Sequence, residues 1–175
     1  MRFGLVAVCG LSVGLMVAGT AMAAGPKYTY PIKTSSGADG GKVTFTNAKV
    51  GGKVKIELKN IPFGDHGVHI HQNAVCDAPD FKGAGGHFNP DGKKHGYMSD
   101  MGHHNGDLPK SVSVGEDHNG EATFVITSIS LDPAAPNSIF ANGGTSLVVH
   151  EKADDEKTDP SGNSGNRIAC AVITK

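Results

Sequence analysis

The sequence predicts an all-β protein, an antiparallel sandwich or Greek-key barrel made of short strands. Twenty-five glycines, nine prolines and no tryptophan among 175 residues favour many turns over long helices. Short β-rich runs recur at regular spacing, and clusters of turn residues separate them. The length suits one domain, and 16 basic against 17 acidic residues leave no bulk charge that would indicate nucleic acid as a partner.

Nine runs are expected to form strands because they alternate in polarity or are rich in β-branched residues. In chain order they are residues 28–33, 42–47, 53–59, 67–72, 111–114, 122–130, 138–141, 145–151 and 168–174. Turns are expected at Asp-Gly-Gly 39–41, Val-Gly-Gly 50–52 and Asn-Gly 119–120. Pro31 lies inside the first run, which indicates an edge position or a displaced strand.

Two segments interrupt this pattern and are expected to be long loops. Residues 73–110 are glycine-rich and largely without strand signals, and residues 152–166 are polar. A loop of this length in a compact domain is usually functional or disordered. The first segment carries four candidate metal ligands, so we expect a metal to order it.

The N-terminus has the pattern of a signal peptide. Arg2 precedes an apolar stretch at residues 3–19, and Ala-Met-Ala at 21–23 fits a cleavage site. An uncleaved membrane anchor is the alternative, but the glycines in the stretch and the small residues at its end favour cleavage. We therefore expect residues 1–23 to be removed, and residues 24–175 to form a single periplasmic or secreted domain without stable membrane association.

Export would change the environment of the cysteines. Cleavage removes Cys9 and leaves Cys76 and Cys170 as the two cysteines of a chain that enters an oxidising compartment.

Three histidines fall on strand-like runs in positions typical of metal ligands. His69 and His71 are two residues apart, so on a strand they share one face, while Val68 and Ile70 occupy the other. Alone, this pair fits a surface feature or a single-metal barrel as well as a larger site. His150 ends another strand-like run and strengthens the metal interpretation.

A second group of candidate ligands lies in the long loop: His87, His95, His104 and Asp107. This group distinguishes a two-metal protein from a single-metal barrel. A tetragonal set of nitrogens favours copper, whereas a tetrahedral set of three histidines and an aspartate favours zinc.

The motifs together resemble the copper/zinc superoxide dismutases of bacterial, exported type. The resemblance spans residues 42–175, with the matching pieces in family order. They are HGVHIH at 66–71, GGHFNP at 85–90, KHG at 94–96, HNGDLP at 104–109, VHEKADD at 149–155 and GNSGNRIAC at 162–170.

This resemblance implies a Greek-key β-barrel, of the immunoglobulin-like sandwich class, with long metal-binding loops. It implies dismutation of superoxide anion to dioxygen and hydrogen peroxide, with one copper and one zinc ion per chain, and it leaves a homodimer open. The implied copper ligands are His69, His71, His87 and His150. The implied zinc ligands are His87, His95, His104 and Asp107.

The resemblance also implies roles for residues around the metals. His87 would bridge the two ions, Asp154 would hydrogen-bond His69 and His95, and Cys76 and Cys170 would form a disulfide. Arg167 would line the copper channel. It is the only arginine left once Arg2 is removed, which suits a fixed docking point for an anion. The alternative for Arg167 is a surface ion pair with Asp154, Asp155 or Asp159.

The remaining histidines have other interpretations. His66 matches a structural position of the family, and His118 lies in a turn-like stretch and is expected to be solvated. His103 adjoins His104, but the three-residue spacing to the aspartate selects His104. The chain departs from the family pattern at Val68, where phenylalanine is usual, at Gln72, and over residues 24–40.

Two rival functions use the same residues. One is a non-catalytic copper/zinc carrier, which would need neither a bridging histidine nor Arg167. The other is a zinc-only hydrolase that uses His69, His71 and His150, and it leaves the second ligand group unexplained.

Overall fold

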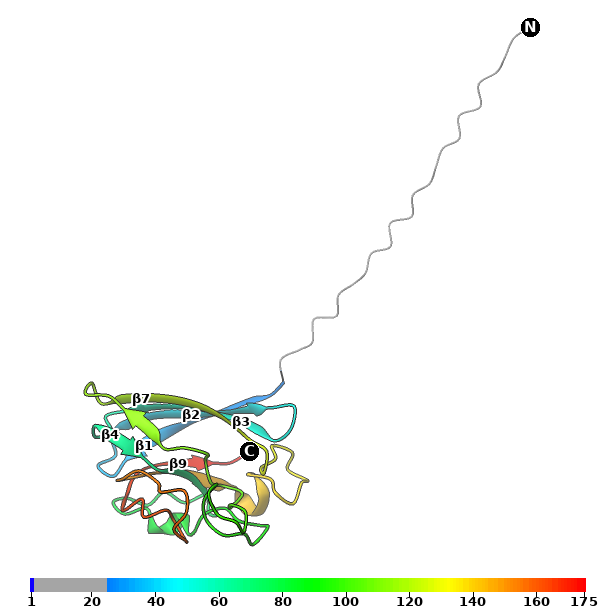
Figure 1. Cartoon of the computed structure of the whole chain (residues 1–175). Helices are drawn as coiled ribbons and strands as arrows, with labels where there is room; N and C mark the ends of the chain where they lie inside the picture. Colours follow the sequence, from blue (N-terminus) through cyan, green and yellow to red (C-terminus); the bar gives the residue numbers. More distant parts are fainter. Residues whose placement is uncertain (2–24) are drawn as a thin grey trace.

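The computed structural model describes Met1 and residues 25–175, and these form a β-structure with two short 3-10 helices (Figure 1). The expected signal peptide lies outside the described residues, apart from Met1. No helix in the described part of the chain is long and apolar enough to cross a membrane. The elements are β1 (Lys27–Thr34), β2 (Asp39–Asn47), β3 (Gly52–Lys59), β4 (Gly64–His66), β5 (Val68–His71), η1 (Lys82–Ala84), β6 (Val112–Val114), β7 (Asn119–Ile126), η2 (Ala141–Gly143), β8 (Thr145–His150) and β9 (Arg167–Ile173).

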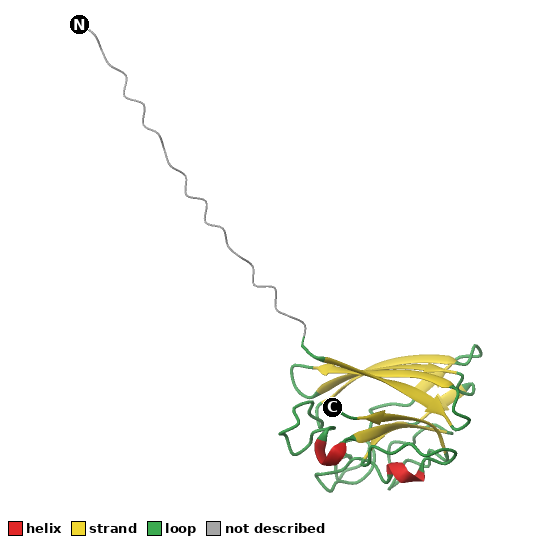
Figure 2. Ribbon diagram, turned by 180° about the vertical axis from the view of Figure 1, so that it is seen from behind, coloured by secondary structure: helices red, strands yellow, loops and turns green. Residues whose placement is uncertain are grey.

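The strands form one antiparallel sheet in the order β4-β6-β7-β3-β2-β1-β9-β8-β5. β4 and β5 stand at opposite ends of this order, yet Gly67 alone separates them in the chain, so the sheet curls into a nearly closed barrel. Figure 2 shows the barrel flattened into two facing layers, with both short helices on the loop side. The predicted all-β Greek-key barrel is therefore confirmed.

Side chains along β5 and β8 point alternately into the barrel core and toward its outer face. Val68 and Ile70 of β5 point into the barrel and are at most 1% exposed, as are Leu147 and Val149 of β8. Fully burying an aliphatic side chain of this size contributes about 1.5–3 kcal/mol. The intervening residues of β5 are His69 and His71, so the strand that fills the core also presents two imidazoles on its outer face.

Two turn predictions were wrong. Gly40 and Gly41 lie within β2, and Asn119 and Gly120 begin β7. The turn before β7 spans residues 115–118, where the His118 amide donates to the Gly115 carbonyl. His118 adopts a left-handed conformation with φ 60°, and the Asp117 carboxylate accepts a hydrogen bond from the Asn119 amide.

The strand expected at residues 138–141 was also wrong. Only an isolated bridge between Ser130 and Ser138 forms there, because successive tight turns replace a ladder. The Ser138 amide donates to the Ala135 carbonyl, and the Ala141 amide donates to the Ser138 carbonyl. The chain then enters η2 instead of a strand.

Pro31 occupies the kind of position that its sequence context indicates. It pairs with Lys42 of β2, whereas β1 pairs with β9 only at Lys33 and Thr34. At Pro31 the strand therefore has a neighbour on one side only, where the missing amide hydrogen is tolerated.

A disulfide joins Cys76 of the long loop to Cys170 of β9, across 94 positions of sequence. Phe81, Ala84 and Val148 pack around it and form a small apolar cluster on the outside of the barrel. The bond thus fastens the beginning of the long loop to the layer that carries the histidines.

Replacing Cys76 with serine should lower the free energy of unfolding by about 4–5 kcal/mol. Without the disulfide, the long loop that it closes gains conformational entropy in the unfolded chain. Denaturant unfolding of the two proteins measures this difference. Thiol titration provides the control, since the unmodified protein should show no reactive thiol after export. Equal unfolding midpoints would contradict the expected stabilisation.

Candidate metal centre

Three imidazoles are positioned by β5 and β8. These strands pair with His69 opposite Val148 and His71 opposite Ser146, and His150 ends β8. The His150 amide donates to the Gly67 carbonyl at 2.8 Å, which fixes the end of β8 beside the start of β5. The three rings therefore stand on one rigid outer face.

The free edge of β5 is covered by two pieces of the long loop. The Phe88 amide donates to the Ile70 carbonyl at 2.8 Å, and the Ile70 amide donates to the Gly106 carbonyl at 2.9 Å. A side chain at Gly106 would collide with the Ile70 carbonyl, so this approach requires glycine. These bonds place His87 beside His71 and Asp107 beside His69.

Four imidazoles converge in a first group: His69, His71, His87 and His150. All four are buried, and one nitrogen of each lies within 4.8 Å of the others. The outward nitrogens are already engaged. His71 Nδ1 donates to the Gly85 carbonyl at 2.9 Å, and His150 Nδ1 lies 3.3 Å from the Gly165 carbonyl.

The nitrogens that remain in this group face one another. His69 Nδ1 and His87 Nε2 are buried and have no hydrogen-bond partner among the described residues. His71 Nε2 and His150 Nε2 are 3.3 Å apart. Buried polar atoms are rarely left unpaired, so this arrangement fits a cation bound by four imidazole nitrogens.

The second predicted group surrounds the Asp107 carboxylate. Asp107 Oδ1 lies 2.8 Å from His87 Nδ1, 3.2 Å from His95 Nδ1 and 3.3 Å from His104 Nδ1. Asp107 Oδ2 accepts hydrogen bonds from the Gly96 and His104 amides at 2.8 and 3.0 Å, which fixes the carboxylate. Three nitrogens and one oxygen thus meet at one place, the donor set that zinc favours.

His69 also has a ring nitrogen within 4.8 Å of donor atoms of His87, His95 and Asp107. We assign it to the first group because it shares the outer face of β5 with His71. Among the described residues its ring also has no nitrogen within 4.0 Å of the Asp107 carboxylate, unlike the rings of His87, His95 and His104. His104 completes the second group, since its Nδ1 is 3.3 Å from His87 Nδ1 as well as from Asp107.

His87 belongs to both groups, with one nitrogen in each. Its Nδ1 faces Asp107 and His104, and its Nε2 lies among the nitrogens of the first group. One imidazole can therefore join two metal ions, as the sequence led us to expect.

Asp154 connects the two groups from outside. Its carboxylate is 2% exposed and contacts His69 Nε2 at 2.6 Å and His95 Nε2 at 3.0 Å. Burial alone would raise the pKa of Asp154, but hydrogen bonds from both rings outweigh it and hold this pKa below its usual range. Gly162, with φ 62°, packs so closely on this carboxylate that a side chain there would displace it. Asp154 therefore fixes which nitrogen each ring directs inward.

Burial controls the protonation of three rings of the first group, His71, His87 and His150. It lowers the pKa of His71 and His150, and neighbouring imidazoles lower both further. It also lowers the pKa of His87 to about 3, against the opposing effect of Asp107. These rings are neutral at physiological pH, the state in which imidazole binds a metal.

His95 behaves differently in the metal-free protein. Burial would lower its pKa, but hydrogen bonds to the carboxylates of Asp107 and Asp154 outweigh burial and raise the pKa to about 10. The position is thus prepared for a positive charge, which a bound cation would supply in place of the proton.

Zinc binding to the metal-free protein should therefore release about one proton at neutral pH, because His95 must lose its proton to become a ligand. The affinity should rise with pH until the pH passes the pKa of His95. Calorimetric titrations in buffers of different protonation enthalpy measure the released proton. A heat of binding that is independent of the buffer would contradict this expectation.

Arg167 lies at the edge of the first group. Its two terminal nitrogens donate to the carbonyls of Phe81 and Gly85 at 2.7 and 2.6 Å. In the described part of the chain it forms no ion pair with Asp154, Asp155 or Asp159, so the alternative drawn from the sequence was wrong. A cleft of about 500 Å³ is lined by Arg167 together with His71, His87 and His150.

The other histidines stay outside both groups. The ring nitrogens of His66 contact the carbonyl oxygens of His150 and Pro62 at 2.7 and 2.8 Å, in agreement with a structural role. His118 is exposed, and its Nδ1 donates to the Ile61 carbonyl. His103 Nδ1 donates to the His104 carbonyl, so this nitrogen is turned away from the second group.

Comparison with known proteins supports the same interpretation. A family model described as copper/zinc superoxide dismutase matches residues 40–173. The chain belongs to this family. Its cofactors are copper and zinc, and the two groups of buried ligands fit them.

Individual relatives agree with this assignment. A copper-zinc superoxide dismutase of Aquifex aeolicus is 41% identical over 76% of this chain and 79% of its own. One from Deinococcus radiodurans is 35% identical over 93% and 92%. A crystal structure of a double mutant of a superoxide dismutase-like protein from Bacillus subtilis has a TM-score of 0.80 and 36% identity, over 84% of this chain and 97% of its own. The chain is accordingly an oxidoreductase of this family.

Proposed function

We propose that the chain dismutates superoxide anion to dioxygen and hydrogen peroxide, with copper in the first group and zinc in the second. His69, His71, His87 and His150 would bind copper, and His87, His95, His104 and Asp107 would bind zinc. One observation carries this proposal: His87 directs one ring nitrogen into each group while both groups are complete.

Bound copper would supply one-electron redox chemistry, and bound zinc a fixed positive charge. The residues of the chain would attract the substrate and hold a proton for the product. Arg167 keeps its guanidinium fixed through two backbone carbonyls and offers a permanent charge to a small anion in the cleft. His87 also lines this cleft, and its Nε2 could hold a proton for the product whenever it is not a copper ligand.

Complete ligand groups distinguish this proposal from a carrier. A carrier would need neither the shared His87 nor a fixed guanidinium beside it. A zinc-only hydrolase that uses His69, His71 and His150 would leave Asp107 and its three imidazoles without a role.

Metal analysis together with superoxide consumption tests the proposal. The protein should bind one copper and one zinc ion per chain and consume superoxide only when copper is present. Full metal content without turnover would favour the carrier. Saturation at a single ion per chain would refute the two-site interpretation.

We further propose that the protein acts outside the cytoplasm after cleavage behind residue 23. The signal pattern at residues 1–23 and the disulfide between Cys76 and Cys170 support this location, because disulfides persist in oxidising compartments. Mass spectrometry of the mature protein from cell fractions tests both points. An intact N-terminus in the cytoplasmic fraction would contradict them.

A further inference from the structure

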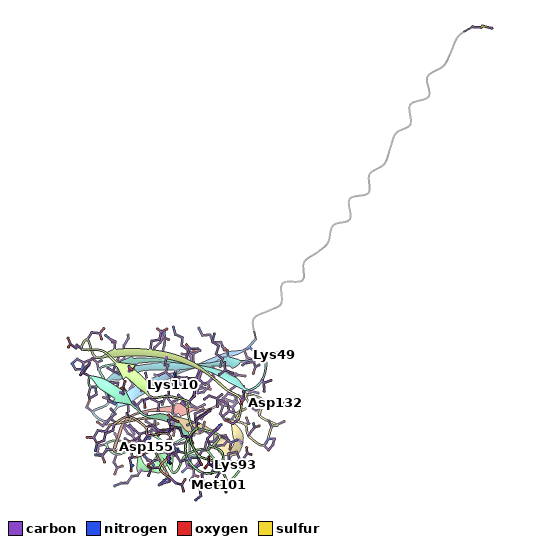
Figure 3. All side chains as sticks on the ribbon, in the orientation of Figure 1. Lys49, Lys93, Met101, Lys110, Asp132 and Asp155 are labelled. Atoms are coloured by element: carbon purple, nitrogen blue, oxygen red, sulfur yellow. A yellow bond between two sulfur atoms is a disulfide. The ribbon has the colours of Figure 1, made fainter. Side chains whose placement is uncertain are left out.

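Met98 and Met101 are placed unusually for methionines. Of the five methionines in the sequence they are the only two within residues 25–175, and each is 68% exposed. Methionine normally fills gaps in a core, but the core here contains none. Figure 3 places Met101 on the loop side of the molecule, near Lys93. Core packing therefore does not account for either thioether.

The segment that carries them is a short loop closed at its base. The rings of Tyr97 and His103 stack there, with centroids 3.9 Å apart and planes inclined by 13°. Residues 98–102 form the loop above this pair. The Gly102 amide donates to the Ser99 carbonyl, and the Met101 amide donates to Ser99 Oγ. These turns keep the chain compact between the two methionines, so both exposed side chains leave the backbone within one tight turn.

The loop is also fixed to the body of the protein. The Met98 amide donates to the Glu156 carbonyl at 2.9 Å, and the Ser99 amide donates to the Gly96 carbonyl at 3.1 Å. A fixed backbone lowers the entropy lost when two flexible thioethers bind one ion.

His103 supplies a third donor atom at the base of this loop. Its Nδ1 donates to the His104 carbonyl at 2.8 Å, which leaves the lone pair on Nε2. No hydrogen bond engages Nε2 within the part of the chain that the structure describes. The ring is only partly buried, and Nε2 is not among the buried atoms that lack a partner, so this nitrogen is accessible at the base of the loop.

We propose that Met98, Met101 and His103 form a third metal site, outside the two buried groups, that binds monovalent copper. Thioethers are soft ligands that select this ion, whereas the oxygen and nitrogen donors around Asp107 suit zinc. The site goes beyond the proposed dismutase function and does not depend on it. It would hold copper on the surface of the same loop that carries His95 and His104.

Silver ion, a redox-inert analogue of monovalent copper, provides the test. The copper- and zinc-loaded protein is titrated with silver nitrate by calorimetry, and its methionine methyl signals are followed by NMR. We expect one additional ion per chain and a joint shift of the Met98 and Met101 signals. Zinc at the same concentration should leave both signals in place.

Variants identify the ligands. Replacing both Met98 and Met101 with leucine keeps size and polarity, and should weaken silver binding at least tenfold with copper content, zinc content and superoxide consumption unchanged. His103→Phe, which retains an aromatic ring beside Tyr97, should weaken binding at least threefold. Val50→Leu, a control at another exposed apolar residue, should leave the affinity unchanged. Equal silver affinity in the double variant, or methyl signals that do not move, would overturn the proposal.

Discussion

Replacing His87 with alanine is expected to lower the rate of superoxide consumption at least about a hundredfold, which is the usual size of the loss of a proton-transferring group. The ring has Nδ1 2.8 Å from Asp107 and Nε2 among the nitrogens of the first group. Its removal takes a ligand from both ions and the proton-holding atom from the cleft. The two metals should then bind independently, whereas in the unmodified protein the binding of one should affect the other. Pulse radiolysis and metal titrations measure these effects.

His118→Ala serves as the matched control for this variant. The exposed side chain of His118 hydrogen-bonds only to the Ile61 carbonyl among the described residues, so its loss should leave the rate unchanged. A His87→Ala protein that kept both metals and the full rate would remove the shared imidazole from the mechanism.

Charge reversal at Arg167 should have the next largest effect. Arg167→Glu should lower the second-order rate constant at least about tenfold while both metals remain bound, because repulsion of the superoxide anion replaces attraction. Arg167→Ala should cost less, since it only removes the attraction. The difference between the two variants should shrink as salt rises, because ions screen charges at a Debye length of about 8–10 Å.

Arg167→Lys separates charge from geometry. Lysine keeps the positive charge but lacks the fork that donates to both Phe81 and Gly85. An intermediate rate is expected, with a salt dependence close to that of the unmodified protein. Equal rates for the unmodified, alanine and glutamate proteins would exclude Arg167 from the reaction.

Local sequence patterns predict much of this fold. Alternation along β5 correctly separates Val68 and Ile70 from His69 and His71, because side chains on a strand repeat every two residues. Alternation and β-propensity do not predict the structure correctly where local hydrogen bonds form turns. Asn119 enters β7 because the turn is completed at His118, and residues around Ser138 form successive turns that β-propensity does not reveal.

The ligand residues could be predicted from their types and spacing, but the groups that hold these ligands in place could not. The Gly85 carbonyl orients His71 and also binds Arg167, and no sequence signal marks a backbone oxygen for such roles. The same holds for Gly162, whose closeness to Asp154 depends on how the loop at residues 152–166 folds back on itself. These features arise from loop conformation, which depends on contacts between distant segments.

The anchoring of Arg167 has a consequence for when the protein becomes active. Arg167 lies three positions before Cys170, and both carbonyls that it binds belong to the segment that Cys76 fastens to β9. The barrel core contains neither cysteine, so a newly made chain can fold while its thiols are still reduced. The two carbonyls that bind its guanidinium are then held less firmly, because hydrogen bonds alone fix their segment. Full activity would follow oxidation of the thiols and not folding alone. A chain whose thiols are still reduced should consume superoxide more slowly even with both ions bound, by no more than the loss expected for Arg167→Ala.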